Sequence, residues 1–189
     1  SVMNVLSTAA ERLNDASDFK TYGVSNSQKD AFSATTTSSA RTGSNSITVS
    51  QIAREQRSVS GAFASTTASL NGGSTITLSM VIGSSSTTTT SIVVNEPTLQ
   101  STVNAINNAK LGVTAEIIDT GGTGDNYRIQ LIGATGAEKA FSLTSDESSL
   151  SFSSVQSATD ANISLNGIDF TRSTNVIDDV LTGVTLTLN

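Results

Sequence analysis

Residues 161–189 read ANISLNGIDFTRSTNVIDDVLTGVTLTLN and decide the fold expected for the rest of the chain. Within this stretch, Asn166-Gly167 stands between two short runs in which apolar and polar residues alternate. Asn-Gly in that setting is the strongest short-range signal of a β-hairpin, because both residues tolerate the positive φ of a type I′ turn. The closing run from Val184 to Leu188 alternates in the same way and predicts a half-buried strand.

Between the hairpin and the last strand, residues 175–183 predict a short helix. Asn175 would cap its first turn, and Asp178 would lie near the positive end of the helix dipole. Gly183 would supply the left-handed stop. Four apolar residues would share one helical face: Val176, Ile177, Val180 and Leu181. Hairpin, helix and strand would then form a compact nucleus that carries no catalytic group.

The composition of the chain excludes several classes of function. With 189 residues, a net charge of -6 and a pI near 4.4, the chain offers no basic surface for nucleic acid. No stretch approaches the roughly 20 apolar residues of a membrane span. Histidine and cysteine are absent, which removes the commonest general base, thiol nucleophiles and the usual zinc ligands. We expect a protein that is not an enzyme and has no catalytic residue, no metal site and no cofactor.

The order of the predicted elements indicates that one domain is inserted in another. Asn71-Gly72-Gly73 interrupts the chain, and a self-sufficient set of elements follows as far as residue 150. This set comprises strands at 76–82 and 91–94, a helix between Glu96 and Gly112, strands at 113–117 and 127–131, and a possible strand at 141–143. Residues 71–150 are therefore expected to form an inserted outer domain.

The parts of the chain that flank this insertion are expected to share one core. Residues 24–70 contain candidate strands at 31–36 and 47–52, whereas 53–63 are ambiguous. Neither 24–70 nor 151–189 holds enough strands alone, but together they have roughly six, which suffices for one inner domain. Residues 1–23 stand apart, because 1–18 show a narrow apolar stripe at helical spacing.

Two motifs invite a chemical interpretation that their context does not favour. The glycine-rich residues 121–124 lack the Lys-Ser/Thr ending of a phosphate loop and lead into a strand, so a hairpin turn is favoured. The acidic pairs Asp146-Glu147 and Asp178-Asp179 have no further acids at calcium-loop spacing. Neither pair is expected to be catalytic.

Three hydroxyl-bearing motifs have a structural and a functional interpretation. Ser17 and Lys20 match the Ser-x-x-Lys spacing of some serine nucleophiles, but the companion motifs are missing and coincidence is preferred. Asn162 begins a glycosylation triplet that lies in a predicted strand. The run of threonines at 87–90 is interpreted as a solvated loop or edge strand, with presentation of hydroxyls to a partner or glycan as the alternative.

Three stretches carry a family resemblance when they are taken together and in order. The first is ITVSQIAREQ at 47–56, and the second is LQSTVNAINN at 99–108 followed by GVTA at 112–115. The third is NGIDFTRSTN at 166–175 followed by GVTLTL at 183–188. With these stretches the chain resembles the bacterial flagellar hook-associated protein 2 family, the filament cap proteins.

The resemblance implies an α+β, mostly β architecture with two β-rich head domains, one inserted in the other, and a helical leg domain. Residues 1–23 would be a remnant of the leg, 24–70 with 151–189 the inner head domain, and 71–150 the inserted outer head domain. The family's long terminal helices are missing at both ends, which would make this chain a head-domain fragment.

The resemblance also implies a function, a location and partners. The protein would be exported through the flagellar secretion channel and would form a homo-oligomeric ring at the extracellular tip of the filament. There it would promote the folding and insertion of flagellin. Some members of the family act as adhesins, so mucin or a host glycan is a further possible partner.

Three classes of function compete at this point. The preferred one is a structural assembly protein, the head region of a filament cap. The alternative is an extracellular β-rich adhesin domain that binds glycan or a host surface. An enzyme ranks last, because the chain has neither histidine nor cysteine.

Overall fold

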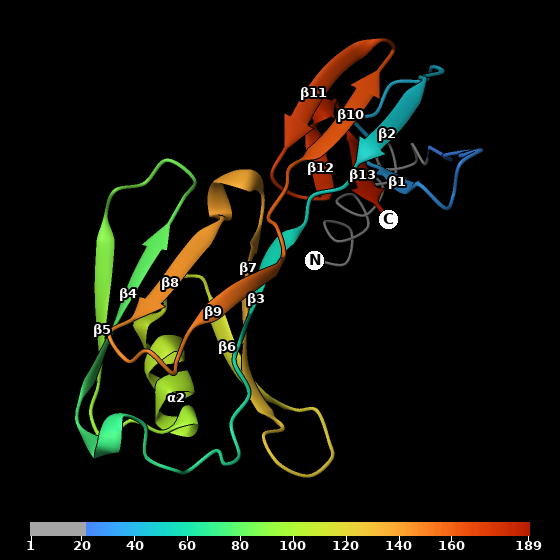
Figure 1. Cartoon of the computed structure of the whole chain (residues 1–189). Coiled ribbons are helices and arrows are strands. Elements are labelled where there is room, and N and C mark those ends of the chain that lie inside the picture. Colours follow the sequence, from blue (N-terminus) through green and yellow to red (C-terminus); the bar gives the residue numbers. More distant parts are fainter. Residues whose placement is uncertain (1–21) are drawn as a thin grey trace, which may run out of the picture. The chain divides into compact units, whose positions relative to one another are not determined.

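The computed structural model describes residues 22–189, which are mostly β and divide into two units (Figure 1). Among the described residues, the first unit comprises 22–50, 163–170 and 175–189, and the second comprises 51–162 and 171–174. The chain therefore leaves the first unit twice, for 51–162 and for the short segment 171–174, and returns to it each time. The helix expected at residues 1–18, and with it the leg remnant at 1–23 apart from its last two residues, lies outside the described residues.

The first unit is built on two antiparallel three-stranded sheets. One has the order β1-β13-β12, formed by Phe32–Thr36, Val184–Leu188 and Val176–Leu181. The other has the order β11-β10-β2, formed by Ile168–Arg172, Ala161–Leu165 and Ile47–Gln51. The strands predicted at 31–36, 47–52 and 184–188 are confirmed.

The hairpin predicted at Asn166-Gly167 is also confirmed. It joins β10 to β11, and both residues have positive φ, 53° and 83°. A neighbouring segment holds the turn in place, because the Ser46 amide donates to Asn166 Oδ1 at 2.9 Å and the Asn166 amide donates to the Ser46 carbonyl at 2.9 Å.

The prediction of a helix at residues 175–183 is wrong, because this segment forms strand β12. Ile177 lies opposite Leu186 and Leu181 lies opposite Val184, so residues 178–180 bulge opposite the single residue Thr185. The bulge interrupts strict alternation, which produced the apparent helical spacing of apolar residues. Pairing along β13 prevails over a helix too short to be stable alone.

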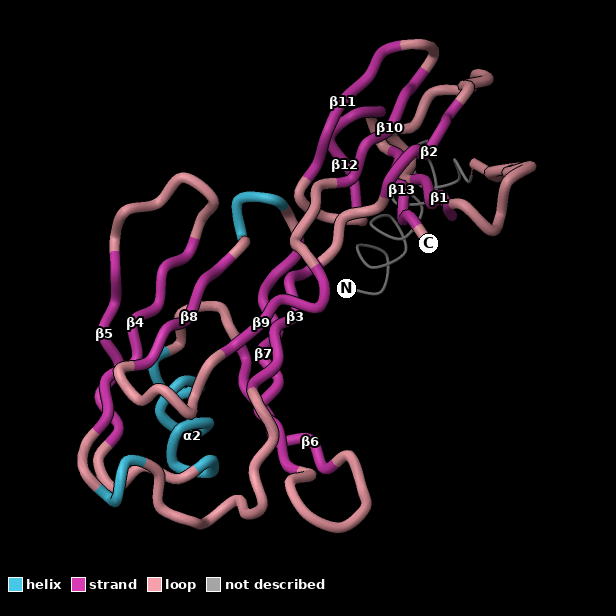
Figure 2. The backbone as a smooth tube through the Cα atoms, viewed as in Figure 1, coloured by secondary structure: helices cyan, strands magenta, loops and turns pink. Residues whose placement is uncertain are grey.

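The second unit also contains two antiparallel sheets. One has the order β6-β7-β3-β9, formed by Thr114–Asp119, Tyr127–Thr135, Glu55–Ser60 and Phe152–Gln156. The other has the order β5-β4-β8, formed by Thr89–Val94, Ile76–Ile82 and Phe141–Ser145. Helix α2, Leu99–Ala109, is the one α-helix within residues 22–189. Figure 2 colours it cyan, together with the short 3-10 turns at Asn71–Gly73 and Ala137–Lys139. The strands and helix predicted between residues 76 and 145 are confirmed.

The borders of the second unit differ from those expected from sequence. The sequence predicts an insertion from 71 to 150, whereas the contacts group 51–162 together with 171–174. Strands β3 and β9 account for most of the difference, since they pair with each other and β3 also pairs with β7.

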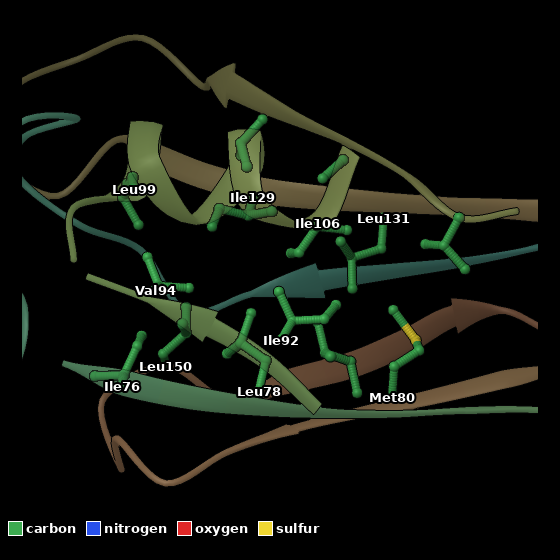
Figure 3. Close-up of a cluster of buried hydrophobic side chains, with 14 of the residues drawn as sticks. Ile76, Leu78, Met80, Ile92, Val94, Leu99, Ile106, Ile129, Leu131 and Leu150 are labelled. Atoms are coloured by element: carbon green, nitrogen blue, oxygen red, sulfur yellow. The ribbon is translucent and has the colours of Figure 1, made fainter. Parts of the chain in front are cut away.

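The core of the second unit lies between its sheets and α2. Figure 3 shows side chains from α2, β4, β5 and β7 pointing toward one another. The fully enclosed members include Ile76, Leu78, Leu99, Ile129 and Leu131, each with no exposed surface. Alternation in the strands and the i, i+3, i+4 spacing in the helix place these residues on the inner faces.

A capping box holds the N-terminus of helix α2. Thr98 is its N-cap and forms a capping box with Ser101, because the Ser101 amide donates to Thr98 Oγ1 at 3.1 Å and the Thr98 amide donates to Ser101 Oγ at 2.8 Å. At the other end, Asn107 bonds both the amide and the carbonyl of Ala115. These bonds tie the helix to the start of β6.

One buried hydroxyl of α2 gives a first prediction. Thr102 has no exposed surface, and its Oγ1 has no hydrogen-bond partner. Thr102→Val keeps the shape and removes the unpaired polar atom, so we expect it to stabilise the protein by about 1 kcal/mol. The same change at the N-cap, Thr98→Val, should destabilise by about 1 kcal/mol. Urea titrations of both variants measure the two shifts, and a loss of stability in Thr102→Val would contradict the expectation.

Candidate interaction surfaces

The paired acids identified in the sequence serve turns and an exposed edge. Asp146 Oδ1 accepts from the Thr77 amide at 2.9 Å, and Glu147 Oε1 accepts from the Ser149 amide at 2.9 Å. The backbone hydrogen bond from Ser149 lowers the pKa of Glu147 below its usual value. Asp178 and Asp179 are exposed on the bulge of β12, in a strand and not in the first turn of a helix. Within residues 22–189, no three acids come together in a way that could hold a metal ion.

The glycine-rich residues 121–124 form the loop of the hairpin between β6 and β7, which confirms the hairpin interpretation. Asp119 Oδ1 accepts from the Gly121 amide at 2.9 Å and from Asn126 Nδ2 at 2.6 Å. The loop leads into β7, so its amides do not lie at the N-terminus of a helix as a phosphate loop requires.

The hydroxyl-bearing motifs are separated from one another. Ser17 and Lys20 lie outside the described residues. Asn162 lies in β10, as predicted, and is half-buried. The threonine run begins in the exposed tip of the β4–β5 hairpin, and Thr89 and Thr90 form the start of β5. Among residues 22–189, the structure thus brings no serine or threonine of these motifs to an acid–base pair.

The first unit contains a broad hollow of about 850 Å³. Its apolar lining comes from one side of β1 and β13, through residues such as Phe32, Ala34 and Leu186, and residues 22–28 and 40–47 complete it. Arg41 is the one charged side chain among its described lining residues. Such a hollow can accommodate other side chains, but its described lining residues offer no pair of groups for proton transfer.

Large apolar side chains are exposed on strands at the edges of the sheets. Val93 on β5 is 57% exposed, Val155 on β9 63%, Ile168 on β11 71% and Val176 on β12 57%. Edge strands present unpaired backbone groups, and an apolar side chain beside them favours contact with another polypeptide. The sequence pattern predicts no contact role for Val93, Val155 or Ile168, although alternation in 91–94 places Val93 opposite the buried face. The helix predicted at 175–183 would place Val176 on its apolar face, but Val176 is exposed instead.

Among the described carboxylates, Asp146 and Glu147 accept hydrogen bonds in turns, and Glu55 forms an ion pair with Arg57. The sequence contains no histidine that could activate a serine. Within residues 22–189, no helix is long and apolar enough to cross a membrane.

Comparisons with known proteins place these surfaces in a family context. The family model described as Flagellar hook-associated protein 2 N-terminus matches residues 1–56. No curated protein matches the chain at the level of sequence.

Solved structures match most of the chain. The D2-D3 domains of the flagellar cap protein FliD from Escherichia coli are 28% identical, with a TM-score of 0.73, over 84% of this chain and 87% of that structure. The D2-D3 domains from Serratia marcescens are 28% identical, with a TM-score of 0.71, over 85% of this chain and 93% of that one. Against the Escherichia coli D1-D2-D3 structure the identity is 28% and the TM-score 0.71, over 84% of this chain but only 49% of that one.

Proposed function

We propose, since the chain belongs to the flagellar hook-associated protein 2 family, that it is a structural part of the flagellar filament cap. The observation that carries this function is the alignment of most of the chain with the D2-D3 domains of the cap protein. The mostly β fold agrees with it, because both units of the chain are sheets packed around their own apolar residues.

The finer parts of this function are also proposals. The full-length protein would be exported through the flagellar channel, assemble as a homo-oligomer at the extracellular filament tip, and contact flagellin there. Exposed apolar residues on edge strands support a role in protein contacts. The matched structures are described as cap proteins, and they lend no support to the adhesin alternative, so binding to mucin or host glycan is not proposed.

A genetic experiment tests the proposed function. Bacteria from which the gene for this chain has been deleted should lose motility, carry short or no filaments, and release unassembled flagellin into the medium. Expression of the protein from a plasmid should restore filament length, measured by electron microscopy. A matched control is a plasmid carrying Thr88→Ala, an exposed residue of the β4–β5 tip, which should restore filaments equally well. Filaments of normal length in the deleted strain would refute the cap function.

We also propose that the second unit is a domain inserted in the first. Arg54 and Thr159 exchange two backbone hydrogen bonds, of 2.9 and 3.0 Å, so the chain enters and leaves this unit at adjacent positions. Deletion of residues 55–158 and closure of the gap with Asn-Gly should leave the first unit folded, because a two-residue turn can join such a pair. Circular dichroism and amide NMR dispersion of the shortened chain measure the outcome. A chain that is unfolded after the deletion would contradict the insertion.

A further inference from the structure

The outer edge of β5 has a regular row of unpaired backbone groups. Thr77 of β4 forms two hydrogen bonds with Asp146, the residue that follows β8. The Thr77 amide donates to Asp146 Oδ1, and the Asp146 amide donates to the Thr77 carbonyl. Backbone groups alternate along a strand, so those of Ile76, Leu78 and Met80 point toward β5. Their partners on β5 are Val94, Ile92 and Thr90. The amides and carbonyls of Thr89, Ser91 and Val93 consequently point away from the sheet.

Within the described residues 22–189, no strand covers this edge, since β5 is the outermost strand of the order β5-β4-β8 (Figure 1). The edge is also rigid before any partner arrives. Ile92 and Val94 are buried in the core, and the register between β4 and β5 runs from Ile76 to Val81 without a bulge. A preformed edge loses little conformational entropy when another strand adds to it.

The other edge strands of the second unit carry features that hinder the addition of a strand. Strand β6 has exposed acids at Glu116 and Asp119. Strand β9 has a bulge at Val155, because Arg57 faces Gln156 while Ser58 faces Ser154. Charges and bulges of this kind block pairing between edges.

The outer edge of β8 is protected in a third way. The Gln56 side chain donates to the Phe141 carbonyl at 2.7 Å and accepts from the Phe141 amide at 2.9 Å. One residue of that edge therefore already has a substitute for a neighbouring strand. Among the described residues, no side chain is seen in such a role at the outer edge of β5, and β5 itself has no bulge and no charge.

The chemistry of the edge favours another copy of the same chain. Residues 84–94 contain no charged residue and no proline, in a chain with a net charge of -6. Two acidic copies of the chain repel each other over most of their surfaces, but the neutral edge of β5 presents no charge to the second copy. A basic or acidic partner would gain no ion pair from such an edge.

We propose that β5 pairs with β5 of a second copy as antiparallel strands related by a two-fold axis at Ser91. Thr89 then lies opposite Val93 of the second copy, Ser91 opposite its equivalent, and Val93 opposite Thr89. These are the three residues whose backbone groups point outward, so each pair exchanges two hydrogen bonds. The two three-stranded sheets become one continuous sheet.

The same register avoids repulsion between like charges. Glu96 lies five residues after Ser91, so it faces the residue five before it, Ser86, in the second copy. The exposed Val93 side chain packs beside the methyl group of Thr89, which is a favourable cross-strand pair. This contact goes beyond the proposed function, and its test does not depend on the cap.

A disulfide provides the test, since the chain contains no cysteine. Ser91→Cys places two thiols opposite each other, with Cα atoms about 5.5 Å apart, a distance that suits a disulfide. Val93→Cys is the matched control, because its equivalent is displaced by four residues, about 13 Å, which a disulfide cannot span. Under mild oxidation of the full chain, the Ser91→Cys dimer should form at least about tenfold faster than the Val93→Cys dimer.

Two further measurements complete the test. The double variant Thr89→Cys/Val93→Cys should regain cross-linking, because the thiol at position 89 of one copy faces the thiol at position 93 of the second copy. Light scattering of the unmodified chain should show a mass that rises with concentration from 19.4 kDa toward twice that value, and Ser91→Pro should abolish the rise by removing an outward amide. Equal cross-linking rates for Ser91→Cys and Val93→Cys would overturn the proposal. A mass that stays monomeric while Ser91→Cys fails to cross-link would overturn it as well.

Discussion

Gly183→Ala is expected to destabilise the first unit by about 3 kcal/mol. Gly183 lies in the tight turn between β12 and β13 with φ of 72°, a conformation that costs an L-residue about 1–2 kcal/mol. A Cβ at this position would collide with the Ala40 amide nitrogen and would lie 2.8 Å from the Ser39 carbonyl carbon. Both are backbone atoms, so the clash cannot be relieved by a change of side-chain rotamer.

The segment that would clash cannot move away freely. Ala40 is buried, and the Thr37 amide donates to the Gly183 carbonyl at 2.9 Å. Displacing residues 37–40 would therefore break this hydrogen bond and expose Ala40. The backbone strain and the lost contacts add to each other, and both act on the sheet that contains the last strand of the chain.

Substitution of a second glycine measures the cost of backbone strain without a steric clash. Gly167 also has positive φ, 83°, but an added Cβ there would meet no atom within 4 Å. Gly167→Ala should cost only about 1 kcal/mol, since it introduces the strain alone. Urea titration gives the two free energies of unfolding, and hydrogen exchange should show faster exchange in β12 and β13 for Gly183→Ala. Equal losses of stability in the two variants would mean that the contact with Ala40 has no energetic weight.

Most strands could be predicted because their buried positions are apolar and alternate. The hairpin at Asn166-Gly167 and the strands β4 and β13 follow this rule, and the rule needs no knowledge of distant parts of the chain. Strand β12 escaped prediction because its bulge destroys the period of two, and only its pairing with β13 reveals the strand. Pairing between distant residues is not visible in the local pattern.

Strand β3 escaped prediction for a different reason. Its buried positions are polar, namely Gln56, Ser58 and Ser60, while its half-buried positions include Val59. The pattern of hydrophobic residues is thus inverted relative to an ordinary strand. The polar side chains are tolerated because they bond buried backbone groups, as when Ser60 Oγ accepts from the Ile129 amide at 2.8 Å. The exposed edge strands could not be predicted from sequence either, because a strand is at an edge only when no other strand pairs with one of its sides.

The buried Gln56 leads to the second large effect. Its side chain bonds both the amide and the carbonyl of Phe141, at 2.9 and 2.7 Å, and Nε2 also donates to Ser58 Oγ at 3.2 Å. Gln56→Met keeps the length of the side chain but leaves the two backbone groups of Phe141 without a partner in the interior. Each buried orphan group costs about 1–3 kcal/mol, so we expect a loss of about 3 kcal/mol.

The matched control for Gln56→Met is the same substitution at an exposed site. Gln51 Nε2 donates to the Asp160 carbonyl at 2.8 Å, but Gln51 is exposed, so water can replace it as the donor. Gln51→Met should therefore change stability by no more than about 0.5 kcal/mol. Urea titration compares the two variants, and hydrogen exchange should show faster exchange at Phe141 in Gln56→Met alone. If both substitutions cost the same, the amide of Gln56 is not what holds β8 against β3.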